Sequence, residues 1–484
     1  MNIKRILKST AKILLVEALL LISPIIIALI YKEPLHNILA FIYTILILLS
    51  FSLPILLITR KEISGIFSSE GFVIVTISWI LLSLFGGLPL LFTGQYNSLV
   101  DTFFETSSGF TTTGASVISD VSHLSQSIIF WKALIQAIGG MGVLVFALAI
   151  LPNANKEDIH LMRAEVPGPI FGKIVSKIGD TAKVLYKIYF VLIITLITAL
   201  MLAGMNLFDA IVHAFETAGT GGFSIYNGSI AYYDSIAIEI ILAVGMIVFS
   251  INFTIYHLII IKKFNEAAKN EEIKWFFVII LLAVIAITIN LTTTKVFDLF
   301  TSLRHAFFTV SSTITTTGFS STDFGNWPLF SQLTILLTMI IGGTAGSTAG
   351  GIKVSRLGAA IKSAISEIKK SKNPKRILKV RFDGKVLNDS YIKSLGAYFI
   401  LYALIFIFLL LCVSIDLKDF MSAFSAVAAT FNNVGPGLAE VGPASSFGML
   451  SDFNKILLSF GMIAGRLEII PMLILFMPET WKRT

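Results

Sequence analysis

Four stretches of the sequence share a pattern that could replace the water around a cation. Each is a short apolar run that ends in small or polar residues and a glycine, and each lies between two longer apolar runs. The glycines recur about a hundred residues apart, which is typical of an internal repeat. The stretches are residues 101–114, 209–222, 305–318 and 422–435, ending in Thr-Thr-Thr-Gly, Gly-Thr-Gly-Gly, Thr-Thr-Thr-Gly and Asn-Asn-Val-Gly.

The length and composition of these stretches are typical of re-entrant segments. A run of roughly 10–14 apolar residues is too short to cross a membrane. Backbone that is not helical is tolerated at membrane depth only where protein buries it or where it lines a watery cavity. If four such segments face one axis, their carbonyl oxygens can replace a cation's hydration shell. Glycine permits the backbone angles required, and a preceding short helix points its partially negative C-terminal end at the ion.

Helix packing is the alternative explanation, because small residues are common where membrane helices contact each other. For a single stretch that explanation is the better one. Four copies in the same place between spanning runs make it improbable, so the sequence favours a pore for a monovalent cation.

The composition indicates a polytopic membrane protein. Of the 484 residues, 55% are hydrophobic and only 14% are charged, and the mean hydropathy is +0.85. A soluble domain needs more polar surface than this. The single cysteine, Cys412, excludes a disulfide framework and a cysteine zinc site. We find no histidine pair with metal-ligand spacing and no catalytic motif, so we expect neither an enzyme nor a resident metal site.

Ten apolar runs are candidates for membrane crossings, most of them close to the roughly 20 residues that a spanning helix needs. The eighth is short and leads into a glycine-rich stretch, so we expect a broken helix that continues from Ile352. Ten crossings place both termini on one side. The runs are 13–30, 38–58, 72–92, 128–151, 186–205, 236–261, 275–291, 329–341, 395–415 and 456–476.

The distribution of lysine and arginine predicts the orientation. Segments 115–127, 223–235 and 319–328 contain neither residue, whereas the alternate segments are basic. By the positive-inside rule the basic segments and both termini face the cytoplasm of a plasma membrane, in bacteria the inner membrane. The net charge of +8 therefore reflects topology and does not indicate nucleic-acid binding. The basic residues include Lys156, Arg163, Lys173, Lys177 and Lys183 in one segment, Lys262, Lys263, Lys269 and Lys274 in the next, and many within 353–393.

The outer segments carry acidic residues instead. Their negative charge would concentrate cations at the mouth of a pore. For each acid taken alone, an ordinary solvated loop position explains it equally well. These acids are Asp120, Asp234, Asp323, Glu440 and Asp452.

These motifs resemble the Trk/Ktr/HKT superfamily of potassium transporters, and within it the TrkH type of potassium uptake subunit. The likeness covers almost the whole chain, and the helix pair before Phe72 resembles the TrkH type more than the shorter KtrB type. It rests on Thr-Thr-Thr-Gly-Ala (111–115), Gly-Gly-Phe-Ser (221–224), Thr-Thr-Thr-Gly-Phe (315–319), Asn-Asn-Val-Gly-Pro-Gly (432–437), Gly-Gly-Met-Gly (139–142), the glycine-rich stretch 342–353 and Gly-Arg-Leu-Glu (465–468).

The resemblance implies an all-α integral membrane protein with four helix–pore-helix–helix repeats around one central pore. It divides the chain into an N-terminal transmembrane helix pair (1–68), pore repeats 1 (69–155), 2 (180–265) and 3 (273–370, with a broken inner helix), a basic cytoplasmic linker (371–393) and pore repeat 4 (394–484).

The resemblance also implies a filter that binds potassium, the transported ion. In the plant branch a serine in place of the first filter glycine accompanies sodium transport, so Gly114 favours potassium. The second and fourth stretches depart from Thr-Thr-Thr-Gly. The implied filter residues are Thr112, Thr113, Gly114, Thr220, Gly221, Gly222, Thr316, Thr317, Gly318, Asn433, Val434 and Gly435.

A flexible glycine-rich loop follows the eighth run, below the expected filter. It lacks the Gly-Lys-Ser/Thr ending of a phosphate loop, so nucleotide binding there is not indicated. The loop suits a gate that blocks or clears the ion path, as the resemblance also implies, whereas the alternative is a close-packed helix kink. The loop residues are Gly342, Gly343, Thr344, Ala345, Gly346, Ser347, Thr348, Ala349, Gly350 and Gly351.

Arg466 lies within the last apolar run, where a charge is costly and a functional role is the first expectation. The resemblance implies that it lies under the filter as an electrostatic barrier, and the alternative is a structural ion pair with Glu468. We expect Lys132 to extend to the outer interface. Glu105 and Glu216 either steer cations or form structural hydrogen bonds.

The resemblance implies three partners: membrane lipid, a second copy of the chain in a homodimer, and a cytoplasmic ring of TrkA-like nucleotide-binding regulatory subunits. Nucleotide is then expected on that partner, and no covalently bound cofactor on this chain. The basic segment 353–393 would dock either on anionic lipid or on the partner.

The alternative function is a secondary transporter that couples monovalent cation uptake to a proton or sodium gradient. Such a transporter predicts two inverted halves, whereas the four copies begin from the same side. Passive flow, coupled symport and the potassium-to-sodium ratio are not distinguished by these patterns.

Overall fold

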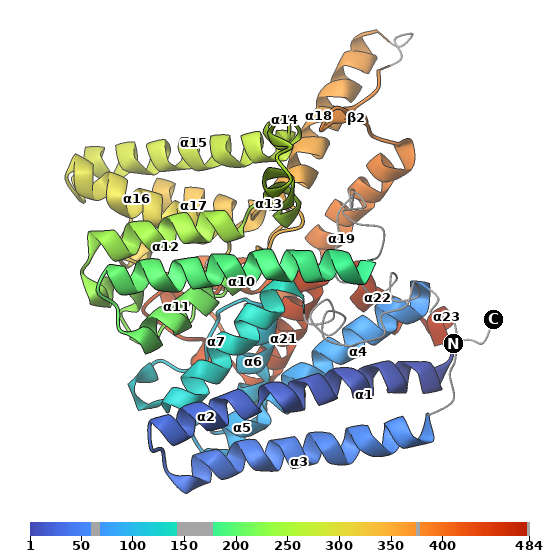
Figure 1. Ribbon diagram of the computed structural model, residues 1–484. Helices are drawn as coiled ribbons and strands as arrows, with labels where there is room; N and C mark the ends of the chain where they lie inside the picture. Colours follow the sequence, from blue (N-terminus) through green and yellow to red (C-terminus); the bar gives the residue numbers. More distant parts are fainter. Residues whose placement is uncertain (60–67, 143–177, 374–377, 482–484) are drawn as a thin grey trace.

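The computed structural model describes residues 1–59, 68–142, 178–373 and 378–481. Most of them form long helices that run roughly parallel to one another, and the N-terminus and the final helix lie at the same end of the molecule (Figure 1). The predicted all-α membrane fold class is confirmed. The part of the basic segment from Lys156 to Lys177, the end of the run 128–151 and residues 60–67 lie outside the described residues.

An N-terminal helix pair precedes the first repeat, as expected. Helices α1 (Ile3–Leu20) and α2 (Ile22–Ile30) are nearly continuous, and α3 (Leu35–Ile58) returns alongside α1 after a turn that ends in Pro34. An ion pair between Arg5 and Glu70, 2.5 Å long and largely buried, joins the pair to the first repeat. The extra helices are therefore part of the folded core.

Four successive units share the order long helix, short helix, inner helix. Their short helices are α6, α11, α16 and α20. The bounds are α4 (Ser68–Gly86), α5 (Leu88–Phe92), α6 (Leu99–Phe110) and α7 (Gln126–Met141); α10 (Ile178–Leu202), α11 (Leu207–Gly219), α12 (Ile236–Phe249) and α13 (Phe253–Ile260); α15 (Glu271–Thr293), α16 (Leu299–Ile314), α17 (Leu329–Ile341) and α18 (Val354–Lys372); α19 (Asp389–Val413), α20 (Phe420–Phe431), α21 (Asp452–Arg466) and α22 (Ile470–Phe476), with short α14 (Phe264–Ala268) and α23 (Pro478–Trp481).

Each short helix begins at a polar side chain that caps its free backbone N–H groups. Ser98, Asn206, Asp298 and Asp419 each accept a hydrogen bond from a backbone nitrogen in the first turn of the helix that follows. Such caps satisfy donors that would otherwise be unpaired, and each contributes about 1 kcal/mol. The four short helices therefore start in the same way, although their sequences differ.

Six helical segments within the described residues are long and apolar enough to cross a membrane, or seven if one bent pair counts as a single span. They coincide with six of the ten predicted runs. The bent pair is α12 and α13, and the short helix α17 ends before the glycine-rich loop, as expected. The total of ten crossings remains a prediction.

Two predicted runs are not continuous helices. The run 236–261 bends by 90° between α12 and α13, where the side chain of Asn252 caps the new helix. The run 456–476 is interrupted after Arg466, since Glu468 and Ile469 have positive φ angles of 58° and 72°. Both breaks lie against the glycine-rich loop, as the contacts below show, so hydropathy alone could not reveal them.

A small hairpin lies in the predicted cytoplasmic linker. Strand β1 (Arg381–Phe382) pairs antiparallel with β2 (Lys385–Val386) through Asp383 and Gly384, which have φ angles of 50° and 71°. Positive φ at both central residues is the geometry of the tight turns that Asp-Gly favours. The Asp383 carboxylate accepts hydrogen bonds from the start of α15, at Glu271 N (2.5 Å) and Asn270 Nδ2 (3.3 Å).

Candidate ion pathway

The backbone closes the C-terminal end of all four short helices in the same way. In each, an N–H donates to the carbonyl five residues back, at 2.8–2.9 Å, and the preceding N–H donates three residues back. This pattern of hydrogen bonds is typical of a helix that ends in a residue with left-handed backbone angles. The first set joins Thr113 to Ser108, Gly221 to Glu216, Thr317 to Ser312 and Val434 to Ala429.

The left-handed residue is not a glycine in any of the four segments. Thr112, Thr220, Thr316 and Asn433 have φ angles of 56°, 60°, 56° and 57°. These left-handed backbone angles are rare for β-branched residues such as threonine, and they cost roughly 1–2 kcal/mol per residue. Strain of this kind persists only where the surrounding structure imposes it, and it is common at functional sites.

The glycine that ends each segment packs against the backbone of another segment. A methyl group on Gly114 would overlap the carbonyl oxygen of Gly221. In the same way Gly222 faces the carbonyl of Thr317, and Gly318 faces that of Val434. Since these glycines also have φ angles of 79°, 73° and 89°, no other residue fits easily.

The last contact closes the ring. Gly435 has a φ of 103°, and a methyl group there would lie 2.8 Å from the carbonyl oxygen of Thr113, in the first segment. A side-chain bond makes the same connection, because Asn433 Nδ2 donates to Thr113 Oγ1 at 2.9 Å. The structure thus brings the twelve predicted filter residues together in the cyclic order 1–2–3–4, with backbone oxygens between neighbours.

A buried ion pair between helices α6 and α7 stabilises the first segment. Lys132 Nζ lies 2.6 Å from Glu105 Oε1, and both side chains are almost fully buried. Glu105 also accepts hydrogen bonds from Ser116 Oγ (2.8 Å) and Val117 N (3.0 Å), just beyond the filter. The expectation that Lys132 extends to the interface is therefore wrong. Its ammonium is needed inside to balance a carboxylate that holds the chain beyond the filter.

The second segment is held by a similar carboxylate. Glu216 accepts a hydrogen bond from Phe223 N at 3.0 Å, and it is fully buried. Of the two roles considered for Glu105 and Glu216, these contacts support the structural one. Gln136 also reaches this segment, since a methyl group on Gly221 would overlap its side-chain amide. Gln136 was not among the residues predicted from the sequence, although a polar residue in an apolar helix is a signal that could have identified it.

The glycine-rich loop lies directly against the filter segments. Gly350 N donates to Thr316 Oγ1 at 2.6 Å, and Gly351 N donates to the carbonyl of Asn432 at 3.1 Å. A methyl group on Gly350 would overlap that same carbonyl. In this conformation the loop therefore touches the third and fourth segments.

The loop is also bound on its other sides. Thr344 Oγ1 donates to the carbonyl of Ser250 (2.8 Å), at the break between α12 and α13. Glu272 Oε1 accepts from Ala345 N (2.8 Å), within the loop, and from Ser355 N (3.0 Å), in the first turn of α18 beyond it. Glu272 is a contact that the sequence did not suggest, since an acid at the start of a helix is usually explained by the helix dipole.

Arg466 connects the loop to the first repeat. Its guanidinium donates to the carbonyl of Thr348 (2.6 Å) and to those of Gly139 (2.7 Å) and Gly140 (2.5 Å), at the end of α7. The structural alternative considered for Arg466 was an ion pair with Glu468. That partner is wrong, because Glu468 is paired with Arg356.

A cavity of about 620 Å³ opens on the far side of the loop from the filter. Loop residues 345–347 and 349–351 line it together with Arg466 and Lys353, and its other wall contains the hairpin at Asp383. Lys353 donates to the carbonyl of Ala349. The loop thus borders the cavity and also contacts the third and fourth segments.

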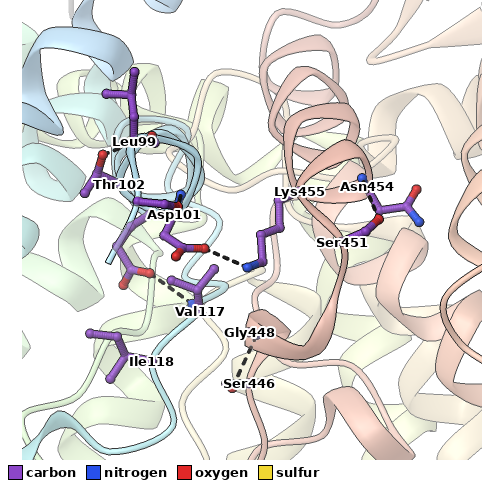
Figure 2. Close-up of polar contacts among 12 residues, drawn as sticks. Leu99, Asp101, Thr102, Val117, Ile118, Ser446, Gly448, Ser451, Asn454 and Lys455 are labelled. Carbon is purple, nitrogen blue, oxygen red and sulfur yellow. Dashed lines mark hydrogen bonds and ion pairs between the residues drawn. The ribbon is translucent and has the colours of Figure 1, made fainter. Parts of the chain in front are cut away.

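Polar contacts also connect helices and loops on the predicted external side of the membrane. Figure 2 shows Lys455, on α21, paired with Asp101, in the first turn of α6. The distance from Lys455 Nζ to Asp101 Oδ1 is 2.7 Å. On the loops beyond the filter, a hydrogen bond of 2.8 Å from the Asn227 amide, with further bonds from Ser122, lowers the pKa of Asp120 to about 2. The other predicted outer acids are exposed, and their role in attracting cations remains a prediction.

Two histidines near the starts of short helices make structural hydrogen bonds. His213 Nδ1 lies 2.8 Å from the carbonyl of Asp209, and His305 Nδ1 lies 3.0 Å from Ser321 Oγ. Within the described ranges, no group of three or more histidine, cysteine or acidic side chains could hold a metal ion.

Comparison with known proteins gives consistent results. The TrkH family model, described as a cation transport protein, matches residues 37–483. The Trk system potassium uptake protein TrkG of Escherichia coli K12 is 35% identical over 468 residues, 96% of each chain. The protein TrkH of Vibrio parahaemolyticus, of the same system, is 36% identical over 492 residues and the full length of both chains. The crystal structure of the potassium transporter TrkH from Vibrio parahaemolyticus superposes with a TM-score of 0.89, at 34% identity over all of both chains.

Proposed function

The chain belongs to the TrkH family of cation transport proteins, and from this premise we propose that it takes up potassium through a filter of backbone carbonyl oxygens. It is a multi-pass membrane protein, and its family is one of transporters and not of enzymes. The named relatives in the Trk system are potassium uptake proteins, so potassium is the ion we propose here.

The ring of four filter segments is the observation that carries this proposal. A potassium ion that enters the membrane must lose water, and carbonyl oxygens from several sides can replace it. Residues 112–114, 220–222, 316–318 and 433–435 supply such oxygens around one axis, with glycine contacts between neighbours. The four helix ends closed by the same hydrogen bonds add their partial negative charge at this place.

We propose that the loop 342–351 is the gate. In the described conformation it lies between the filter segments and the cavity, so an ion would need the loop to move aside. The Arg466 guanidinium adds positive charge beside this path and holds the loop at Thr348. Removing residues 345–347, which line the cavity, should weaken the block and raise ion flux. Unchanged flux in folded protein would contradict the gate.

We propose that cytoplasmic regulation acts through the hairpin. Asp383 accepts a hydrogen bond from Glu271 N at the start of α15, and Lys362 of α18 pairs with Glu271. The next residue, Glu272, accepts from Ala345 N in the loop and from Ser355 N in α18. A displacement of the hairpin would therefore reach the loop through two adjacent residues. A TrkA-like nucleotide-binding subunit on this face, a homodimer with one pore in each subunit, and cytoplasmic termini in the bacterial inner membrane complete the proposal.

Growth rescue of cells that lack potassium uptake is the direct test. The chain should restore growth at low potassium, and rubidium should compete with potassium while sodium does not. Gly396→Ala is a suitable control variant, because a methyl group on Gly396 contacts nothing within 4 Å. Failure to move potassium, rubidium or sodium, with and without a regulatory subunit, would refute the function.

Rubidium uptake into proteoliposomes separates passive flow from coupled transport. If a proton or sodium gradient drives rubidium uptake against its own gradient, the secondary-transporter alternative holds. If rubidium only equilibrates, the filter acts as a passive pore.

A further inference from the structure

Two acidic residues occupy equivalent places in repeats 1 and 2 but have different partners. Asp101 and Asp209 each lie in the first turn of a short helix, and the N-cap side chain of each helix accepts a hydrogen bond from their backbone nitrogen, at 3.0 Å and 2.9 Å. The charge of Asp101 is balanced by the ammonium of Lys455 at 2.7 Å (Figure 2). Among the described residues, no lysine or arginine pairs with Asp209.

Asp209 is nevertheless almost fully buried, with 5% of the residue exposed. Two tyrosine hydroxyls donate to its Oδ2, Tyr233 at 2.7 Å and Tyr226 at 3.2 Å. Burial and the nearby carboxylate raise the pKa of Tyr226 to about 12, so this hydroxyl stays a donor. The start of the helix also favours a negative charge. These groups stabilise the carboxylate, but none of them carries a full positive charge.

An open pocket of about 750 Å³ lies beside Asp209, on the side of the membrane that we assign as external. Its lining includes the rings of Tyr31, Phe208, Tyr226 and Tyr232, and the described residues that line it include no lysine or arginine. Tyr226 and Tyr232 stack at 3.6 Å between ring centroids, and Tyr232 is 59% exposed. The pocket therefore combines aromatic surface with a negative charge.

We propose that this pocket binds an organic ammonium cation, which takes the place that Lys455 fills in repeat 1. The faces of aromatic rings attract ammonium groups, and a nearby carboxylate adds to that attraction. The size is in the range of small-molecule sites. Two sources share this chemistry: a soluble quaternary ammonium compound, and the headgroup of an ethanolamine lipid whose chains would cover exposed Leu207 and Ile30.

The test uses the full chain in nanodiscs of phosphatidylglycerol and tetramethylammonium as the probe. Calorimetric titration at constant potassium should show saturable binding to the wild type. Tyr232→Leu removes an exposed ring, and Asp209→Asn removes the charge but keeps an oxygen for the tyrosine hydroxyls. Each should weaken binding about tenfold. Asp452→Asn, the same change at an exposed outer acid, should leave binding within about twofold of the wild type.

Nanodiscs that also contain phosphatidylethanolamine distinguish the two sources. A lower apparent affinity for tetramethylammonium there identifies the lipid headgroup as the occupant, and an unchanged affinity identifies a soluble ligand. No binding to the wild type in phosphatidylglycerol would overturn the proposal. So would wild-type affinity in both Tyr232→Leu and Asp209→Asn, or displacement of the probe by rubidium at equal concentration, which indicates an inorganic site. The Tyr232→Leu variant is decisive if Asp209→Asn does not fold.

Discussion

Replacing Arg466 by glutamine should open the pathway. In the structure, one of its three backbone contacts, the 2.6 Å bond to Thr348, holds the loop, and the bonds to Gly139 and Gly140 anchor the guanidinium to α7. A hydrogen bond to a charged group contributes about 1.5–3 kcal/mol. If the closed loop loses that stabilisation, the ratio of open to closed forms rises about 10- to 150-fold, at 1.4 kcal/mol per factor of ten.

Initial rates of rubidium uptake into proteoliposomes measure this effect, with the chain alone and no regulatory subunit. Arg466→Gln should transport at least about tenfold faster than the wild type, since both the hydrogen bond to Thr348 and the local positive charge are lost. Arg466→Lys keeps the charge but cannot reach all three carbonyls, so its rate should lie between the two. Lys12→Gln, which also removes a positive charge, is the control, because this lysine is exposed on α1, in the N-terminal helix pair and outside the four repeats.

Two results would refute the reasoning. If Arg466→Gln is folded and monodisperse but transports at the wild-type rate, the arginine neither holds the loop nor limits ion flow. If Arg466→Gln is lost from the membrane fraction while Arg466→Lys is stable and unchanged in rate, the residue has only a structural role.

Three further outcomes are expected. Gly222→Ala should abolish rubidium uptake in folded protein, because its methyl group would overlap a filter carbonyl, whereas Gly396→Ala should transport normally; uptake by Gly222→Ala would contradict the ring. Lys132→Met should lower the free energy of unfolding by about 3–5 kcal/mol in thermal melts, since it leaves the buried Glu105 carboxyl without its ammonium partner, and adding Glu105→Gln should recover part of that loss. The pKa of Asp120 is about 2 instead of 3.8, so the stabilisation from its hydrogen bonds is complete above pH 3.8 and is lost as the pH falls through 2. Hydrogen exchange of the outer loops should increase over this pH window, and Asp120→Asn should remove that increase.

Local sequence patterns were sufficient to predict the class of protein and the four glycine-ended segments that the structure brings together. Long apolar runs predict spanning helices because each backbone group must be satisfied within its own helix in lipid. The filter segments could be located because a glycine with positive φ is a local requirement that the sequence displays directly, at Gly114 as at Gly435. The loop 342–351 was found for the same reason, since glycine-rich backbone at membrane depth is rare.

Partner choice between charged groups could not be read in this way. Lys132 looks like an interfacial lysine in its own helix, and only the packing of α6 against α7 places it beside Glu105. Glu468 lies two positions from Arg466 but pairs with Arg356, 112 positions away. The cost of burying a charge depends on the groups that surround it in space, and sequence distance does not report those groups.

The sequence by itself determined that this is a membrane protein of four repeats, each with a short helix and a glycine-ended segment, because hydropathy and backbone freedom are properties of neighbouring residues. Only the tertiary structure decided that the segments form one closed ring, with Asn433 bonded to Thr113 across 320 positions, and that the loop and Arg466 lie beneath it. The physical reason is that a ring of carbonyl oxygens exists only when distant segments pack together, and packing depends on the shape of the whole core.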